Sequence, residues 1–358
     1  MSGTDLLAPG AVIGILGGGQ LGRMTALAAA AMGYRSHIFC PDADAPASQV
    51  TDRTTQAGYG DTAALDAFAA SVDVVTYEFE NIPYGTVAHL AGRVPVHPGA
   101  GALAVCQDRL AEKVFVNCLG IGTADFRVVP DPSVLPALVD GLDGPCVLKA
   151  NTMGYDGKGQ ALIRHPHEAE DAWLAVGARL CVLEKFVEFE REVSVIAARD
   201  RAGRVVCYPA VENRHEHHIL KHTLAPAPDF EARQEAAQAI AVRLIEGLDM
   251  VGVLAVEMFA CSDGRLLVNE LAPRPHNSGH WTIEGCRVSQ FANLVRALVG
   301  LPVADPGVRG RAEMLNLLGD EADDWAALAA DPAASVHLYG KAEARPGRKM
   351  GHVTRLIS

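Results

Sequence analysis

Short apolar segments alternate with helix-like segments along the first hundred residues. Apolar runs at residues 11–16, 35–40 and 72–79 have the length of strands, and residues 20–33 and 61–70 have the composition of helices. This alternation is typical of βαβ units, which build a parallel sheet and bind ligands at the carboxyl ends of its strands. The pattern therefore predicts an open parallel-sheet domain at the N-terminus.

The pattern changes after about residue 108 to a mixture of helices and strands typical of α+β structure. Helices are expected at residues 108–120 and 291–300, and a long one from about Asp229 to Gly247, where apolar positions recur at helical spacing. Strands are expected between these helices, at residues 145–150, 181–186, 192–198, 204–212 and on both sides of Asp263-Gly264. Residues 301–358 show weak strand signals and a basic stretch.

Composition and charge narrow the classes of function. The chain has 358 residues, of which 49% are apolar and 21% charged, as in a globular protein of two or three domains. Its formal net charge of −12 argues against nucleic acid or an anionic membrane as the main partner. The eight scattered cysteines form no C-x-x-C pair and are interpreted as reduced core residues. We see no secretory signal and no apolar run of membrane-spanning length, so we expect a cytoplasmic protein.

A pair of glutamates near a predicted hairpin is the most informative local feature. Asp263-Gly264 is a strong signal for a two-residue turn, and that turn places Glu257 directly opposite Glu270. Opposed like charges destabilise a sheet, so the pair suggests a cation between them. Carboxylate oxygens on rigid strands suit Mg²⁺, which also binds substrate phosphates. The alternative is two unrelated glutamates beside a turn of another length.

A glycine-rich loop follows the strand that ends at Lys149. Residues 151–160 read NTMGYDGKGQ, and their backbone N–H groups together with Lys158 can cover a polyphosphate. The loop is not a Walker A loop, because Thr152 stands where the first glycine would be. Lys149 itself either snorkels to solvent or points at an anion. The alternative for the loop is a flexible surface connection.

Six segments together resemble the N5-carboxyaminoimidazole ribonucleotide synthases, the ATP-grasp ligases of bacterial and fungal purine synthesis. In chain order they are VIGILGGGQLGRM, VTYEFENIP, KANTMGYDGKGQ, EKFV, VNELAPRPHNSGHWT and KAEARPGRKMGH. The resemblance runs from about residue 11 to 355. It implies an N-terminal nucleotide-fold domain (1–108), an ATP-grasp domain of two α+β subdomains (109–300, with a lid at about 125–188) and a small β-rich C-terminal domain (301–358).

The resemblance also implies a reaction. ATP, bicarbonate and 5-aminoimidazole ribonucleotide would give the N5-carboxylated product, ADP and phosphate, through carboxyphosphate and with Mg²⁺. A homodimer is implied too, since similar enzymes are dimers. Three alternatives remain: a formate-using ATP-grasp ligase of purine synthesis, an NAD-dependent oxidoreductase, and an ATP-grasp-like binding protein without turnover.

The resemblance assigns ATP-binding positions residue by residue. Arg109 and Lys149 would contact phosphates, Glu192 would bind the ribose hydroxyls, and Glu257 and Glu270 would bind the metal. The full set of implied ATP-binding residues is Arg109, Lys149, Gly154, Tyr155, Asp156, Gly157, Lys158, Gly159, Gln160, Glu184, Lys185, Phe186, Val187, Glu192, His215, Asn269 and Glu270. Residues 184–187 would meet the adenine through backbone groups. Arg274, Lys149 and Lys158 are the implied catalytic residues.

The ribonucleotide-binding positions are implied in the same way. Three of them, Arg274, Lys341 and Arg348, are cations that suit a 5′-phosphate. The full set is Gly19, Gln20, Leu21, Glu78, Tyr155, Asp156, Arg274, His276, Lys341 and Arg348.

Two motifs invite other interpretations. Gly17, Gly19 and Gly22 fit the G-x-G-x-x-G dinucleotide fingerprint, but the resemblance assigns the anion at this turn to the ribonucleotide and not to NAD. The histidines of NRHEHHIL suggest zinc, but an H-E-x-x-H motif would need histidine at Ile219. We interpret that segment as a solvated or substrate-facing loop.

Overall fold

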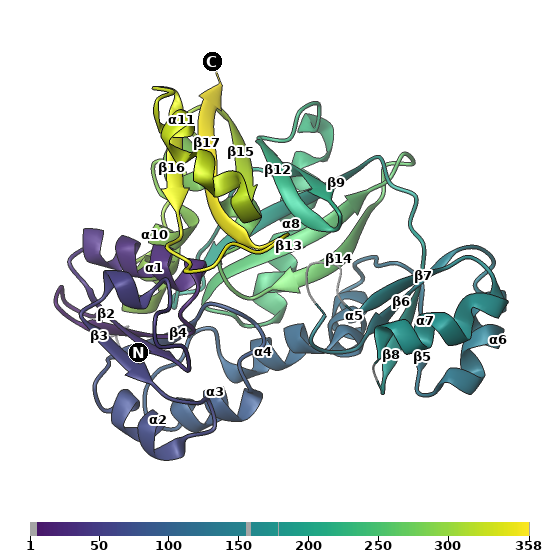
Figure 1. The fold of residues 1–358 in the computed structure, drawn as a ribbon, viewed down its shortest axis with the longest axis horizontal. Helices are drawn as coiled ribbons and strands as arrows, with labels where there is room; N and C mark the ends of the chain where they lie inside the picture. Colours follow the sequence, from purple (N-terminus) through teal and green to yellow (C-terminus); the bar gives the residue numbers. More distant parts are fainter. Residues whose placement is uncertain (1–5, 155–158, 178, 358) are drawn as a thin grey trace.

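The computed structural model describes residues 6–154, 159–177 and 179–357. These residues form three sheets, one of nine strands and two of four. In Figure 1 the N-terminal sheet and the second four-stranded sheet lie at opposite ends of the molecule, with the large sheet between them. No helix in the described ranges combines the length and the apolar composition needed to cross a membrane.

The N-terminal sheet is parallel, as predicted, with the strand order β3-β2-β1-β4. Its elements are β1 (Val12–Leu16), α1 (Gln20–Ala31), β2 (Arg35–Cys40), β3 (Arg53–Gln56), α2 (Thr62–Ala69), β4 (Val74–Tyr77) and α3 (Tyr84–Ala91). Strand β1 lies inside the sheet and is almost wholly buried. Strand β3 was not predicted, because this edge strand reads RTTQ and buries none of its residues fully.

Two helices connect the N-terminal sheet to the rest of the chain, α4 (Ala100–Gln107) and α5 (Arg109–Cys118). Asp108 separates them and caps α5, since its carboxylate accepts a hydrogen bond from the Ala111 N–H. The Asn151 amide donates to the same carboxylate over 2.7 Å. The glycine-rich loop that begins at Asn151 is therefore tied to the start of α5.

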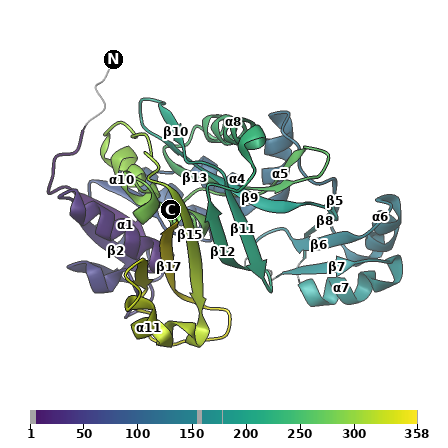
Figure 2. The same cartoon turned by 90° about the horizontal axis from the view of Figure 1, so that it is seen from above.

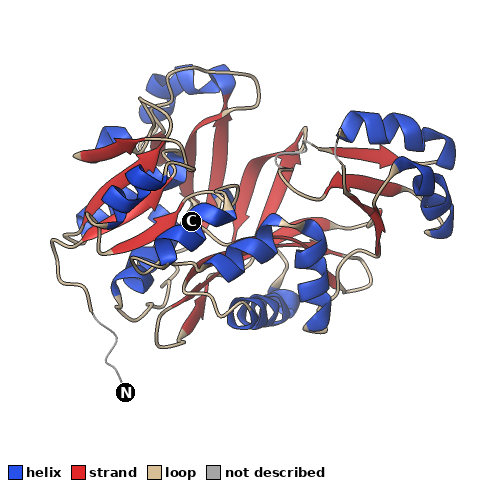
Figure 3. Cartoon of the chain, turned by 90° about the horizontal axis from the view of Figure 1, so that it is seen from below, coloured by secondary structure: helices blue, strands red, loops and turns tan. Residues whose placement is uncertain are grey.

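The second four-stranded sheet is antiparallel, with the order β5-β8-β6-β7. Its elements are β5 (Phe126–Val129), α6 (Leu135–Gly141), β6 (Cys146–Ala150), β7 (Gln160–Ile163), α7 (Ala169–Val176) and β8 (Cys181–Lys185). Leu148 and Leu183 pack into a core that this unit shares with α6 and α7, and Figure 3 shows helices beside the sheet at this end of the molecule. The other face of the sheet presents Lys149 and Glu184.

The large sheet has the order β14-β13-β9-β11-β12-β15-β17-β16, with β10 paired to β9. Its strands are β9 (Arg191–Arg199), β10 (Val205–Cys207), β11 (Val211–Glu216), β12 (Ile219–Ala225), β13 (Gly252–Ala260), β14 (Leu266–Ala272), β15 (Arg311–Leu318), β16 (Ala334–Leu338) and β17 (Lys349–Ile357). The remaining helices are α8 (Glu231–Gly247), α9 (Thr282–Gly285), α10 (Gln290–Val299) and α11 (Trp325–Ala329), and the 3₁₀ helices are Ser48–Val50, Pro132–Val134, Pro166–Glu168, Asn277–Gly279 and Gly319–Asp324. The C-terminal strands extend the large sheet through β12 and β15 (Figure 2).

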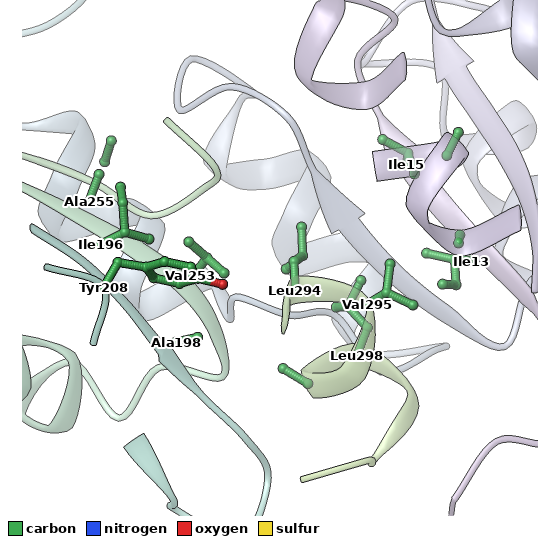
Figure 4. Close-up of a cluster of buried hydrophobic side chains, with 14 of the residues drawn as sticks. Ile13, Ile15, Ile196, Ala198, Tyr208, Val253, Ala255, Leu294, Val295 and Leu298 are labelled. Carbon is green, nitrogen blue, oxygen red and sulfur yellow. The ribbon is translucent and has the colours of Figure 1, made fainter. Parts of the chain in front are cut away.

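Helices α8 and α10 cover opposite faces of the large sheet. Alternate residues of β9 point to opposite faces, so Val193 and Val195 pack in the α8 core while Ile196 packs in the core of α10. Figure 4 shows Leu294 and Leu298 of α10 between this sheet and strand β1. The helix therefore joins the N-terminal sheet to the large sheet.

Leu294 tests this junction, because it is 1% exposed and contributes to the core on both sides of α10. We expect Leu294→Ala to lower the free energy of unfolding by about 2–5 kcal/mol in urea titrations, through lost burial and the cavity left behind. The control is Leu174→Ala on α7, where the side chain is 70% exposed and a change within about 0.5 kcal/mol is expected. Equal effects of the two substitutions would contradict the proposed packing role.

Candidate active site

The two glutamates of the predicted hairpin do face each other. Strands β13 and β14 are antiparallel, and Glu257 pairs with Glu270. The predicted two-residue turn is nevertheless wrong, because the Cys261 N–H donates to the Arg265 carbonyl and so closes a longer turn. A β-bulge beyond Met258, which pairs with Val268, shifts the register by one residue and restores the facing pair.

The bulge also decides which way Asn269 points. Neighbouring side chains of a regular strand point to opposite faces, and a bulge relaxes that rule. Here the side-chain oxygen Oδ1 of Asn269 accepts a hydrogen bond from Lys149 at 3.3 Å, and the Glu270 carboxylate lies 3.6 Å from the Arg109 guanidinium. Asn269 and Glu270 therefore both face the cations of one site.

The donor set fits a divalent cation. Glu257 and Glu270 are partly exposed, and burial together with the charge of Glu257 raises the pKa of Glu270, although Arg109 opposes the shift. The part of this rise that comes from Glu257 is a like-charge repulsion, which a cation between the two carboxylates would relieve. Two carboxylates and the Asn269 oxygen beside two cations are the ligands expected for Mg²⁺ that also binds phosphate.

A polar chain fixes the position of Glu257. The His276 Nε2 lies 3.0 Å from the Glu257 carboxylate, and its Nδ1 accepts a hydrogen bond from the Ser278 N–H. With Nδ1 as the acceptor, a neutral imidazole carries its proton on Nε2 and donates it to Glu257. The Ser278 hydroxyl in turn contacts Ser194 on β9 at 2.7 Å. Glu257 is therefore held by groups from the same face of the large sheet.

Lys149 links the second four-stranded sheet to the large sheet. Its ammonium group donates to Glu184 at 2.9 Å and to Asn269. Glu184 is also 3.1 Å from the ammonium group of Lys113 on α5. Burial alone would raise the pKa of the Glu184 carboxyl, but Lys149 and Lys113 outweigh it and lower that pKa to about 2. Two ammonium groups thus hold the Glu184 side chain, and contact of residues 184–187 with adenine through backbone groups stays a prediction.

Part of the predicted adenine segment is already used by the protein. The Lys185 N–H donates to the Asp125 carbonyl and the Phe186 N–H to the Pro145 carbonyl. For the Val187 N–H, no partner is recorded among the described residues. If adenine binds here as predicted, the Val187 N–H and the carbonyl groups of this segment are the backbone groups left for it.

Glu192 and His215 form a pair at the same end of the large sheet. The His215 Nδ1 is 2.9 Å from the Glu192 carboxylate. Burial alone would lower the pKa of His215, but this hydrogen bond raises it. Glu192, His215 and Glu257 bring their ligand atoms within 4.8 Å of one another, so the predicted ribose and metal positions are adjacent.

The glycine-rich turn before α1 binds a carboxylate of the chain itself. The N–H groups of Gly19 and Gly22 donate to the Glu78 carboxylate, the second over 2.9 Å. A Cβ atom on Gly19 would lie 2.6 Å from a Glu78 oxygen, which explains the glycine. Leu21 is buried beside Phe291. The anion position that a dinucleotide would occupy is therefore filled, and contacts of Gly19, Gln20 and Leu21 with a ribonucleotide stay a prediction.

Burial raises the pKa of Glu78, and the hydrogen bonds from the glycine turn and the positive charges of Arg274 and Lys341 oppose that rise. Arg274 is ion-paired to Glu80, a residue that the sequence analysis did not single out. Burial would raise the pKa of Glu80, but Arg274 lowers it to about 2. The signal that points to Glu80 is its place in VTYEFENIP, two residues after Glu78.

The structure does not bring every predicted residue together. Tyr155, Asp156, Gly157 and Lys158 lie outside the described residues. Arg348 donates to the carbonyl of Glu343 in its own loop. Gly154 lines a cavity. Gln160 pairs with Lys149 across strands β6 and β7, and the Gly159 carbonyl accepts a hydrogen bond from the Ala150 N–H.

A cavity lies beside α5 and strand β14. Its lining includes Glu80 in the segment after β4, Arg109 and Glu112 on α5, Asn151 and Gly154 in the segment after β6, and Glu270 on β14. Glu112 is 3% exposed and its carboxylate accepts a hydrogen bond from the Leu271 N–H at 2.8 Å. Nothing in the sequence points to Glu112, because it stands in an ordinary helical pattern.

Three family models match consecutive parts of the chain: the ribonucleotide synthetase preATP-grasp domain at residues 11–107, the ATP-grasp domain at 114–291 and the phosphoribosylaminoimidazole carboxylase C-terminal domain at 312–358. The N5-carboxyaminoimidazole ribonucleotide synthases of Brucella melitensis and Bacillus subtilis are 48% and 42% identical to the chain, over 98% of its length and 97% and 92% of theirs. The chain belongs to the N5-carboxyaminoimidazole ribonucleotide synthase family. It is an ATP-grasp ligase, as the resemblance implied.

Solved structures of this synthase family have the same fold. An ADP complex of purK superposes with a TM-score of 0.95 at 42% identity, covering 99% of this chain and 94% of that one. The Aspergillus clavatus synthase in complex with ADP and 5-aminoimidazole ribonucleotide gives 0.90 at 33% identity, covering 98% and 94%. The chain spans only 37% of a bifunctional purine synthesis protein of Dictyostelium discoideum, to which it is 45% identical.

The Glu112 environment predicts a pH-dependent effect of Glu112→Gln. Burial, with a smaller contribution from Glu270, raises the pKa of Glu112 from 4.5 to about 8. A raised carboxyl pKa means that ionisation destabilises the fold as pH rises from the unfolded value toward 8. We expect the substitution to raise the free energy of unfolding by about 1–3 kcal/mol near pH 9 and to change it little near pH 4, measured by urea titration. An exposed control, Glu246→Gln, should show no such pH dependence, and an equal effect at both pH values would contradict the assignment.

The ion pair with Arg274 predicts that Glu80→Gln impairs catalysis. Without its carboxylate partner Arg274 loses its fixed orientation, so kcat/KM for the ribonucleotide should fall about 10- to 100-fold. Steady-state kinetics measure the fall in kcat/KM, and a thermal melt shows whether the variant is still folded. The exposed Glu235→Gln is the matched control. A folded Glu80→Gln variant with wild-type kcat/KM would show that Arg274 needs no such partner.

Proposed function

We propose that the chain carboxylates 5-aminoimidazole ribonucleotide with bicarbonate and ATP, giving the N5-carboxylated ribonucleotide, ADP and phosphate. The observation that supports this most directly is the facing pair Glu257 and Glu270, with Asn269, Lys149 and Arg109 around it. Such a cluster suits the terminal phosphates of ATP and a divalent ion. The Aspergillus clavatus relative, solved with ADP and the ribonucleotide, supports the same pair of substrates.

In this proposal the nucleotide lies between the second four-stranded sheet and the large sheet. Arg109 and Lys149 bind phosphate oxygens, and Glu192 binds the ribose hydroxyls beside His215. The Val187 N–H and neighbouring carbonyls bind adenine. Glu257 and Glu270 would hold Mg²⁺, which supplies neutralisation of phosphate charge when bound.

The chemistry needs no nucleophile from the protein. A bicarbonate oxygen attacks the γ-phosphorus and the bond to ADP breaks, giving carboxyphosphate. The amine of the ribonucleotide then attacks the carboxyl carbon, phosphate leaves, and the departing phosphate takes the proton lost by the amine. The residues orient the reactants and exclude water: Arg274 and His276 at the bicarbonate, and Glu78, Lys341 and Arg348 at the ribonucleotide.

We also propose a homodimer and a cytoplasmic location. Leu27 on α1 is 49% exposed, an apolar side chain on the outer surface of the N-terminal unit. All eight cysteines are unpaired, which fits a reducing compartment. Light scattering after size-exclusion chromatography measures the oligomeric state directly.

Phosphate release with each substrate omitted in turn tests the proposed reaction. We expect release to require ATP, Mg²⁺, bicarbonate and the ribonucleotide together, because only the ribonucleotide draws carboxyphosphate forward. Glu257→Gln and Glu270→Gln should each lower kcat about 100-fold or more through lost charge stabilisation, while the exposed Glu170→Gln should not. ATP turnover that is unaffected by leaving out the ribonucleotide would overturn the proposal, and turnover with formate in place of bicarbonate would favour the formate-using alternative.

A further inference from the structure

Lys113 is a buried cation for which the proposed reaction has no direct use. It stands on α5 and is 1% exposed. Its ammonium group lies 3.1 Å from one oxygen of Glu184, and among the described residues no hydrogen-bond acceptor for it is recorded. An ammonium group has three hydrogen-bond donors, so burying Lys113 with so few partners is costly. A contribution of Lys113 to the stability of the fold therefore does not explain why a lysine stands here.

The partner of Lys113 is shared with a residue of the ATP site. Glu184 is 3% exposed, and its second oxygen accepts a hydrogen bond from Lys149 at 2.9 Å. Lys149 also reaches Asn269 beside the facing glutamates. One buried carboxylate is therefore held between two ammonium groups, and the three side chains together carry one excess positive charge.

We propose that Lys113 is a positioning residue that keeps Glu184 neutralised, so that Lys149 is available to the phosphates of the nucleotide. This inference rests on the proposed function, in which Lys149 binds those phosphates. In the unliganded protein Glu184 holds both lysines in place and prevents their mutual repulsion. When a phosphate group attracts Lys149, Glu184 keeps its contact with Lys113.

The energetic reason lies in the cost of breaking a buried ion pair. With Lys149 as its only cation, Glu184 would be left as an uncompensated buried charge whenever Lys149 turned toward a phosphate, and such a charge is strongly unfavourable. A second cation on the other oxygen removes that cost. Since α5 lies outside the four-stranded sheet, Lys113 does so from a different element than Lys149 and Glu184.

Charge-balanced variants test this arrangement by calorimetric titration with Mg²⁺-ADP. We expect Lys113→Met to weaken binding about tenfold, because Lys149 is then retained by Glu184. Glu184→Gln should bind more tightly than wild type, since Lys149 is then no longer held by a carboxylate, and its unliganded form should melt at a lower temperature because the two lysines are left without an anion between them. The double variant Lys113→Met/Glu184→Gln should recover most of the lost affinity, because it frees Lys149 again. Arg127→Met, an exposed cation on β5 of the same sheet, is the charge-matched control.

Steady-state kinetics add a second readout. Lys113→Met should raise KM for ATP far more than it lowers kcat at saturating ATP, and the double variant should reverse most of the change in KM. A general loss of structure would lower kcat and would not be reversed by removing a second charge.

Two results would overturn the inference. If the double variant binds as weakly as Lys113→Met, Lys113 acts on the nucleotide directly or through the fold. If Glu184→Gln binds more weakly than wild type, Glu184 does not compete for Lys149, and this result decides the matter even if Lys113→Met fails to fold. Failure of the wild-type protein to bind Mg²⁺-ADP would instead count against the proposed function.

Discussion

Two carboxylates held face to face on neighbouring strands repel each other, and the site is arranged around that repulsion. Glu257 is balanced by His276 and Glu270 by Arg109, so each acid has a cationic or proton-donating neighbour from a different segment. The remaining imbalance is a like-charge interaction that a divalent ion would relieve. The large sheet supplies the anions, while α5 and the second four-stranded sheet supply the cations, so the site exists only where these elements meet.

The sequence predicted the facing pair through two deviations that cancel. The turn at Asp263-Gly264 is longer than its signal indicated, and a bulge at Asn269 offsets the difference. Period and turn chemistry describe single elements and their nearest neighbours, so they identified the parallel sheet and the helices α1, α2, α5, α8 and α10 but not the shorter helices. A bulge depends on what the strand packs against, and no local pattern in this sequence reports it.

Contacts between distant segments are the part of the site that local patterns miss. Glu80 and Arg274 are 194 positions apart, and Lys113 and Glu184 come from a helix and a strand of different units. Lys113 and Glu112 look like ordinary polar positions of an amphipathic helix, and only burial distinguishes them. The glycine fingerprint does not identify its ligand for a related reason. Its spacing indicates that an anionic group approaches the turn closely, and in this structure the Glu78 carboxylate accepts hydrogen bonds from the N–H groups of Gly19 and Gly22.

The pairing of β12 with β15 has a consequence for how the C-terminal segment relates to the rest of the chain. Its family model begins at residue 312, yet the hydrogen-bonded ladder runs across that point without interruption. Removing the last fifty residues would strip β12 of its neighbour and leave a row of bare amides and carbonyls, the kind of surface on which chains aggregate. The start of the C-terminal family model is thus not a structural domain boundary in the folded molecule. The basic segment between β16 and β17 belongs to the same continuous sheet as Glu257 and Glu270.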